Sequence, residues 1–456
     1  MATNCIAQVT FKFEGLGKPV VARFDTPHAS SDGGAILLKG IDTQLGLTRR
    51  LAGCLADARQ PGKVRHQGIE VLQQRVFGIA CGYADCNDAA RLADDAIHKL
   101  LADRDPIAGP ALASQPTLSR FENAVGARAL IAMGRLLADT VIEHHRRRLK
   151  GRATRIIIDL DPTDDPTHGQ QEFTFFNGHY DTSCYLPVVA TVTFNDEAEQ
   201  YAVAAVLRPG NAPAKLGAIG LLRRLFKTLR AAFPTAILRV RLDGGFASNP
   251  LFKFLEAAGV EYVVGMASNV RLEKRVQRLM GKARMRSKAT GRTAHLYGET
   301  RYAAKQWSRK RRIVMKAEVV RHPGRDPKNN PRFVVTNLPD APQAVYEFYC
   351  QRGDMENRLK ELHHGVEMDR TSCSRFLANQ FRVLLALAAY LLFQELRRRA
   401  RGTGCADAQV TTLRERLIKL AVWVDRSVRR LVLHLPSTFP WLRPWREIAC
   451  AVGATS

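Results

Sequence analysis

The stretch Thr154-Arg-Ile-Ile-Ile-Asp-Leu-Asp-Pro-Thr-Asp-Asp165 decides how the rest of this chain is interpreted. Its β-branched run Ile156–Ile158 is typical of a buried central strand, and Pro162, which cannot donate to a sheet ladder, ends that strand. Asp159 and Asp161 are two residues apart and therefore point to the same face of the strand. The pattern predicts carboxylates at the end of a buried strand, where Mg²⁺ or Mn²⁺ could be held. From this stretch alone, an acidic turn without a ligand is the alternative.

Composition indicates a globular, strongly basic protein. The 456 residues are 46% hydrophobic and carry a net charge of +26, which predicts two to four domains and a nucleic-acid partner. The nine cysteines show no framework spacing, so reduced thiols and a cytoplasmic, nucleoid-associated location are expected. No signal-peptide pattern is present, and the longest apolar run, Val383–Phe393, is too short for a membrane span. We therefore expect no membrane partner.

Residues 1–150 are predicted to form a mainly helical DNA-binding region. Alternating residues in 7–25 suggest strands, and helices are expected over 35–55, as two or three segments within 66–102, and over 128–149. A further helix is expected to begin with Thr117 as its N-cap. No recognition helix can be identified, so a helical domain that does not contact DNA is equally compatible with the pattern.

Residues 151–269 are predicted to form an α/β domain. The expected elements are three strands, a helix, a strand, a helix and a strand, over 154–161, 185–194, 200–208, 213–233, 236–242, 249–258 and 260–266. A meander followed by two parallel crossovers gives a mixed sheet with helices on both faces. This is the order of the ribonuclease-H-like fold, and the second part of the same domain is expected over 339–400, with a C-terminal region over 401–456.

Residues 270–338 are predicted to be a basic, β-rich insertion of loops and strands. Between 270 and 335 there are 20 Lys and Arg residues against four acids, and strand-like pieces lie at 294–302, 311–320 and 332–338. This concentration of charge near one aromatic side chain favours phosphate contact over an ordinary solvated face. The candidate DNA-binding residues are Lys305, Trp307, Arg309, Lys310, Arg311 and Arg312.

Two further acids could complete a cation site with Asp161. Asp243 follows the strand at 236–242 and precedes two glycines, and the inferred topology puts this strand beside the one that carries Asp161. On a helix that starts near Gln343, Tyr349, Arg352 and Glu356 have i, i+3, i+7 spacing and share one face. Such carboxylates can hold two metal ions, and the arginine can bind a phosphate. The alternative is a turn aspartate and a helix with a surface Glu356–Lys360 pair.

The chain resembles the DDE transposases of bacterial insertion sequences, and more narrowly the insertion-sequence family numbered thirteen-eighty. The resemblance is carried by Asp159–Asp165 with His168–Gln171, by Asp243–Phe246, by the Tyr-x-x-Arg-x-x-x-Glu helix and by the basic insertion before that helix. It implies Asp161, Asp243 and Glu356 as a triad that binds two Mg²⁺ ions, which Mn²⁺ could replace. Asp159 is the second choice for the first ligand.

The resemblance also implies the substrates and the partners. They are double-stranded DNA, as the element's terminal inverted repeats and as target DNA, and a second copy of the chain in the DNA complex. Tyr349 and Arg352 would orient the DNA, and Trp307 is the candidate for holding a flipped base. The family pattern expects a lysine seven residues after the glutamate, where this chain has His363, so Lys360 is the possible substitute. A nuclease or resolvase of the same fold, or a non-catalytic DNA-binding regulator, are the alternative functions.

Overall fold

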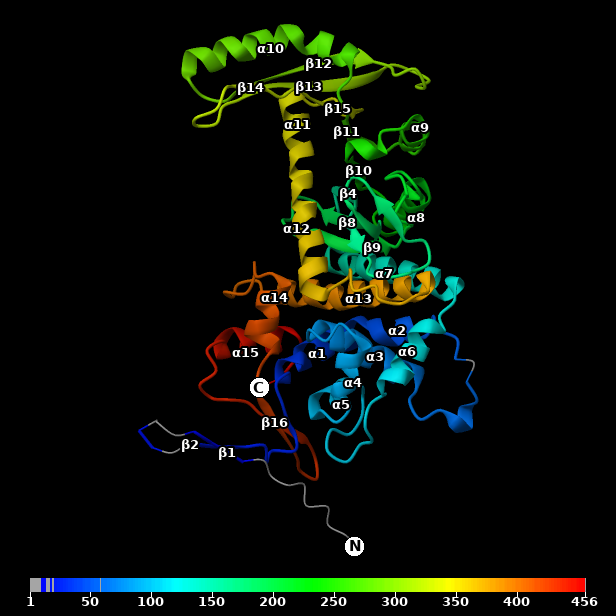
Figure 1. Cartoon of the computed structure of the whole chain (residues 1–456), viewed down its shortest axis with the longest axis vertical. Coiled ribbons are helices and arrows are strands. Elements are labelled where there is room, and N and C mark those ends of the chain that lie inside the picture. Colours follow the sequence, from blue (N-terminus) through cyan, green and yellow to red (C-terminus); the bar gives the residue numbers. More distant parts are fainter. Residues whose placement is uncertain (1–9, 14–16, 19, 58, 456) are drawn as a thin grey trace. The chain divides into compact units, whose positions relative to one another are not determined.

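The computed structural model describes residues 10–13, 17–18, 20–57 and 59–455 (Figure 1). The chain packs as two units. The first consists of residues 1–52, 57–121 and 392–456, and the second consists of residues 53–56 and 122–391. Three segments that are distant in the sequence therefore build the first unit, whereas the second is nearly continuous.

A mixed sheet of nine strands is the centre of the second unit. Its order is β12-β13-β15-β11-β10-β4-β8-β9, with β14 beside β13. The strands are β4 (Arg155–Pro162), β8 (Val188–Phe194), β9 (Tyr201–Val206), β10 (Ile237–Leu242), β11 (Glu261–Met266), β12 (Ala294–Tyr302), β13 (Arg311–Val320), β14 (Lys328–Asn329) and β15 (Arg332–Thr336). Strands β4, β8 and β9 form an antiparallel meander, and β10 and β11 run parallel to β4. The helices α8 (Ala218–Ala232) and α9 (Asn249–Ala257) make the two crossovers, so the predicted order of elements over this segment is confirmed.

The basic segment 270–338 extends the same sheet. The predicted strands at 294–302 and 311–320 are β12 and β13, and β15 pairs antiparallel with β11. The expectation of loops and strands throughout was wrong for 270–290, which form the long helix α10 (Val270–Thr290) over β12 and β13 (Figure 1). Asn269 caps this helix by accepting from two backbone N–H groups, and Gly291 ends it at φ 67°. The helix is hard to detect in the sequence because each buried residue is separated from the next by charged residues.

A nearly continuous helical rod follows the sheet in the sequence (Figure 1). It consists of α11 (Pro342–Cys350), a 3-10 turn (Gln351–Gly353), α12 (Asp354–Lys360) and a π-helical turn (Glu361–Gly365). Val345 and Tyr346 of α11 pack against Val263, Val314 and Val334 of the sheet. This packing fixes the rod along the sheet. The rod presents the Tyr349–Glu356 segment near the ends of the central strands.

A long helix, a small sheet and the part of a second long helix up to residue 391 complete the second unit. Helix α7 (Ala127–Arg148) packs on β9, where His145 lies against Phe194 and Tyr201. A small sheet contains β5 (Asp165–Pro166), β6 (Phe175–Asn177) and β7 (Thr182–Tyr185). Helix α13 (Phe376–Arg399) has the length and composition of a membrane span, but 83% of its apolar window is buried within the protein, as in a core helix.

The first unit is mainly helical. It ends at residue 121 and includes 392–456, whereas the expected N-terminal region ran from 1 to 150. It contains α1 (Ile36–Leu45), α2 (Leu47–Ala52), α3 (Gly68–Ala80), α4 (Cys86–Arg91), α5 (Ala96–Leu101), α14 (Val410–Leu413), a π-helical turn (Arg414–Ile418) and α15 (Leu442–Ala451). Its strands are the hairpin β1 (Thr10–Phe13) and β2 (Val20–Arg23), and the sheet of β3 (Ala29–Ser30), β16 (Val422–Arg426) and β17 (Leu431–His434). Residues 7–9, 14–16 and 19 of the predicted strand segment 7–25 lie outside the described part of the chain.

The predicted start of one helix was wrong. Helix α6 (Gln115–Asn123) begins before Thr117, whose backbone N–H already donates to the carbonyl oxygen of Ser114 at 2.9 Å. Pro116 fits the first turn because that turn needs no N–H donor. Thr117 is therefore a helical residue and not the N-cap.

A buried ion pair joins the central strands of the second unit. Arg241 of β10 and Asp159 of β4 are direct partners in the parallel register, and both side chains are at most 3% exposed. The guanidinium donates to both carboxylate oxygens, at 2.8 and 2.7 Å. Its third nitrogen donates to the carbonyl oxygen of Phe348 in α11 at 3.2 Å. One side chain thus connects two strands and the helical rod.

We predict that Arg241→Met destabilises the second unit by about 3–5 kcal/mol, because the substitution leaves the Asp159 carboxylate buried without a counter-charge. Chemical denaturation followed by circular dichroism would measure the loss. The double variant Asp159→Leu/Arg241→Met should recover most of it, since it leaves no buried charge behind. A single variant within about 0.5 kcal/mol of the natural protein would contradict this role.

Candidate active site

Two carboxylates leave neighbouring parallel strands at the same edge of the sheet. Leu160 of β4 pairs with Leu242 of β10, so the residues that follow, Asp161 and Asp243, come next to each other. Asp161 is buried, at 8% exposure, and Asp243 begins a tight turn by accepting from the N–H of Gly245 at 3.1 Å. The predicted adjacency of these strands is therefore confirmed.

The helical rod places an arginine side chain beside Asp161. Arg352, in the 3-10 turn between α11 and α12, donates to Asp161 Oδ2 at 2.7 Å. Tyr349 lies near the end of α11. Its hydroxyl oxygen lies so close to Gly265 that a Cβ added at that glycine would be only 2.5 Å away. Burial raises the pKa of Tyr349, an effect that Arg352 opposes and Asp243 reinforces, so all three groups are close.

Electrostatics place Glu356 in the same group. Burial raises the pKa of Asp161 to about 6; Arg352 acts against the rise, whereas the charges of Asp243 and Glu356 add to it. Glu356 itself is exposed, on α12. The structure therefore places Asp161 and Asp243 at neighbouring strand ends, with Arg352 bound to Asp161 and the charge of Glu356 acting on it from α12. The oxygens of these three acids are farther apart than 4.8 Å as a group. Carboxylate oxygens are the donors that Mg²⁺ and Mn²⁺ prefer, and a divalent cation would relieve the repulsion among them.

Asp159 does not fit the role of a metal ligand that the sequence left open. Both of its carboxylate oxygens accept from Arg241, and Gln200 donates to one of them at 3.2 Å. Both oxygens are thus already hydrogen-bonded, two residues before Asp161 on the same strand. Among the two candidates on β4, Asp161 is the carboxylate that faces the other acids.

Arg311 was wrongly predicted to contact phosphate. It is 3% exposed, and its guanidinium binds both oxygens of Glu256, at 2.7 and 3.0 Å. The same guanidinium lies 5.3 Å from the centre of the Trp307 ring, and Phe252 packs edge-on against that ring at 5.1 Å. Trp307 is thus held in a half-buried aromatic cluster beside the strand β12 residue Tyr302.

The other predicted basic residues differ in availability. Arg312 is bound to Glu299 and to the carbonyl oxygen of Asp340, at 2.8 and 2.7 Å, so its role is structural. Arg309 pairs with Glu256 at 2.9 Å but its side chain is 62% exposed. Lys305, Lys310 and Lys360 are exposed. The exposed residues keep the capacity to meet a phosphate, which the sequence predicted for the whole set.

His363, which replaces the expected lysine, lies against the Asp161–Thr163 turn. Its Nε2 is 3.2 Å from the hydroxyl of Thr163, and its Nδ1 is 3.5 Å from Asp369. Burial lowers the pKa of His363, which Asp369 opposes. The imidazole thus contacts the side chain two residues after Asp161. No sequence pattern indicated this contact, because 200 residues separate the partners.

Asp165, which follows the turn after β4, is buried, at 1% exposure. Its two carboxylate oxygens both lie 2.9 Å from the hydroxyl of Thr371. Burial raises its pKa to about 8, with a contribution from the charge of Asp369. Asp165 therefore carries a proton at neutral pH and acts as a hydrogen-bonding group behind the site.

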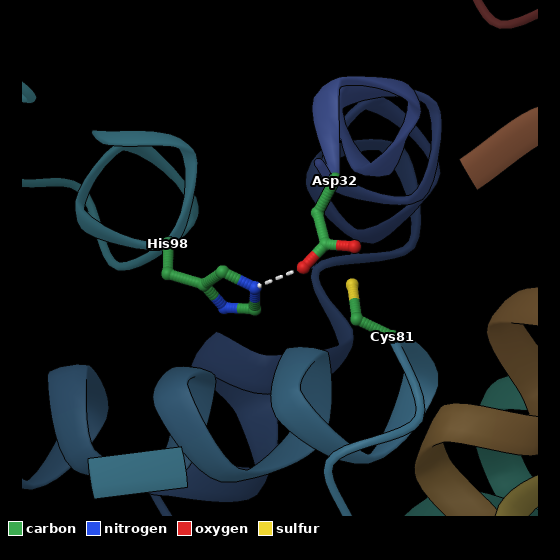
Figure 2. A group of neighbouring side chains, drawn as sticks. All are labelled: Asp32, Cys81 and His98. Carbon is green, nitrogen blue, oxygen red and sulfur yellow. Dashed lines mark hydrogen bonds and ion pairs between the residues drawn. The ribbon is translucent and has the colours of Figure 1, made fainter. Parts of the chain in front are cut away.

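The first unit contains a second cluster of ligand-type side chains. Asp32, Cys81 and His98 are all buried, with their donor atoms within 4.8 Å of one another (Figure 2). Asp32 accepts from His98 at 2.9 Å and pairs with Lys419 at 2.7 Å. Burial raises the pKa of the Cys81 thiol well above its ordinary value. The ammonium of Lys419 already balances Asp32, and a protonated thiol is a poor ligand, so the cluster fits a structural ion pair better than a metal centre. All eight cysteines in the described residues are free thiols.

We predict that Asp165→Asn makes stability less dependent on pH. The folded protein holds a proton up to about pH 8, whereas the unfolded chain releases it near pH 4. The free energy of unfolding should therefore fall as pH rises between those values, and asparagine removes this contribution. Thermal unfolding between pH 5 and 8 would measure it, with the half-buried neighbour Asp164→Asn as the control. A variant whose decline equals that of the natural protein would contradict the buried proton.

Comparison with known proteins identifies the family of the chain. A sequence model of the family described as "Transposase DDE domain group 1" matches residues 13–453. No curated protein matches the chain. The match covers nearly the whole chain, including both units and all the acids described above. The chain therefore belongs to the DDE transposase domain family, group 1.

Proposed function

We propose that this protein is a DNA transposase that cuts the ends of an insertion sequence and joins them to target DNA. The observation that carries the proposal is the position of Asp161 and Asp243 at adjacent strand ends, with Arg352 bound to Asp161 and the charge of Glu356 acting on it. Family membership supports transposase activity. The resemblance in motif spacing supports the narrower family numbered thirteen-eighty, a ribonuclease-H-like core, and terminal inverted repeats as substrate.

Asp161, Asp243 and Glu356 would hold the metal, with Mg²⁺ as the expected ion and Mn²⁺ as a substitute. Two bound ions would activate the attacking oxygen and stabilise the leaving oxygen of a phosphodiester. In the first reaction, water attacks a phosphorus atom at the element end, the P–O3′ bond breaks, and a free 3′-hydroxyl is left. In the second, that hydroxyl attacks a target phosphodiester, so that one P–O bond forms for each one that breaks.

Arg352 is the residue that we propose to change partners when DNA binds. Its ion pair with Asp161 keeps a buried carboxylate neutralised in the DNA-free protein. A guanidinium can bind two oxygens of a phosphate, and a cation at Asp161 would release it for that purpose. Tyr349, whose hydroxyl lies between Gly265 and Arg352, would donate to the same phosphate. The pair would align the phosphodiester for attack.

We predict that Asp161→Asn, Asp243→Asn and Glu356→Gln lose Mg²⁺-dependent cleavage of terminal DNA by at least about 100-fold, because removing even an indirect metal contact costs about 10–100-fold. Binding to the same DNA, measured by fluorescence anisotropy, should remain within about threefold. Asp164→Asn, on the same turn, is the control and should cut normally. Full cleavage by the three variants would contradict the assignment.

Two alternatives are separated by the products. A labelled terminal fragment incubated with a circular target yields joined product for a transposase, and free ends alone for a nuclease or resolvase. A regulator derived from a transposase would bind the DNA without cutting it in Mg²⁺ or Mn²⁺. Size-exclusion chromatography of the DNA complex tests the proposed homodimer.

A further inference from the structure

Helix α10 has one buried face and two different exposed flanks. Leu272, Val276, Met280, Ala283 and Ser287 are buried and recur at helical spacing. This stripe is packed on β12 and β13, so the apolar face of the helix is already covered. At 100° per residue, the other side chains divide into a flank on each side of the stripe.

All the charged residues on one flank are basic. Arg271, Arg278, Lys282 and Arg286 are exposed and lie within about 80° of one another around the helix axis. They span 16 residues, 271–286, and the 15 steps between the first and the last amount to roughly 22 Å of helix. Arg275, on the same flank, is tethered to Thr300 at 2.8 Å. The rest of the exposed surface carries Lys274, Arg284 and Lys288 together with the acid Glu273, so the flank with Arg271, Arg278, Lys282 and Arg286 is the one without an acid.

The covered apolar face of α10 indicates which kind of polyanion could bind the basic stripe. A basic amphipathic helix that binds a membrane must insert its apolar face among the lipids. The apolar face of α10 is packed on the sheet and cannot do so. What remains for a partner is a row of long cationic side chains spaced by one helical turn. Such a row complements a regular row of phosphates, as in a nucleic-acid backbone.

We propose that Arg271, Arg278, Lys282 and Arg286 of α10 form a contact surface for the backbone of duplex DNA that does not depend on base sequence. The choice of DNA among polyanions rests on the proposed function. Phosphate contacts by arginine and lysine position a duplex without reading its bases. The surface would therefore hold DNA of any sequence beside the element end or at the target.

Two double variants of the full-length protein test the surface. Arg278→Gln/Lys282→Gln removes two charges from the stripe, and Arg284→Gln/Lys288→Gln removes two charges from the opposite flank of the same helix. Binding to a random-sequence 30-base-pair duplex would be measured in EDTA at several salt concentrations. The stripe variant should weaken binding by at least about tenfold and reduce the slope of log affinity against log salt by about 1.8. The control variant should change the slope by less than about 0.5.

Equal losses in the two variants would overturn the proposal, because they would show only the effect of net charge. Tighter binding to single-stranded RNA than to the duplex would also overturn it. Circular dichroism and thermal unfolding exclude misfolding, since neither variant changes a buried residue. The measurement needs no divalent ion and no cleavage. Its result is therefore independent of whether the Asp161, Asp243 and Glu356 variants still cut DNA.

Discussion

The ion pair between Asp159 and Arg241 is the constraint on which the site depends. It crosses the two strands that end in Asp161 and Asp243, and Arg241 also donates to the backbone of α11. A slip of one residue between these strands would separate the pair inside a buried sheet, which costs several kcal/mol. The strands can therefore deliver their terminal carboxylates in only one relative position. The same guanidinium sets the distance from the strands to Tyr349 and Arg352.

The carboxylates behind the site are neutralised within the second unit, whereas those at the strand ends are only partly neutralised. Behind the site, Asp159 is permanently paired and Asp165 is protonated, so neither needs a mobile counter-ion. At the strand ends, Asp161 and Asp243 face a single arginine, and the charge of Glu356 on α12 adds to theirs. The excess negative charge is thus confined to the place where a divalent ion and a phosphate would come together.

Much of the fold could be predicted from local patterns. The runs from Arg155 to Met266 are β-branched or amphipathic and are separated by turn residues, so their order and the Asp161–Asp243 adjacency followed. Helix α10 was missed because its apolar residues are isolated among cations, which resembles a solvated loop. The role of Arg311 depends on Glu256, 55 residues earlier, and that of Asp165 on Thr371, 206 residues later. Contacts between residues so far apart in the sequence cannot be inferred from local patterns.

The continuity of the nine-stranded sheet has a geometric consequence. From β10 to β12 there are four steps between adjacent strands, which at about 4.8 Å each amount to roughly 19 Å. Along a duplex, this distance corresponds to about six base pairs, or somewhat more than half a helical turn. Hydrogen bonds connect every pair of adjacent strands from β10 to β12. The distance between the end of β10 and the far edge of the sheet is therefore fixed. A duplex held at both points would present one particular phosphate, chosen by helical phase, to the acids.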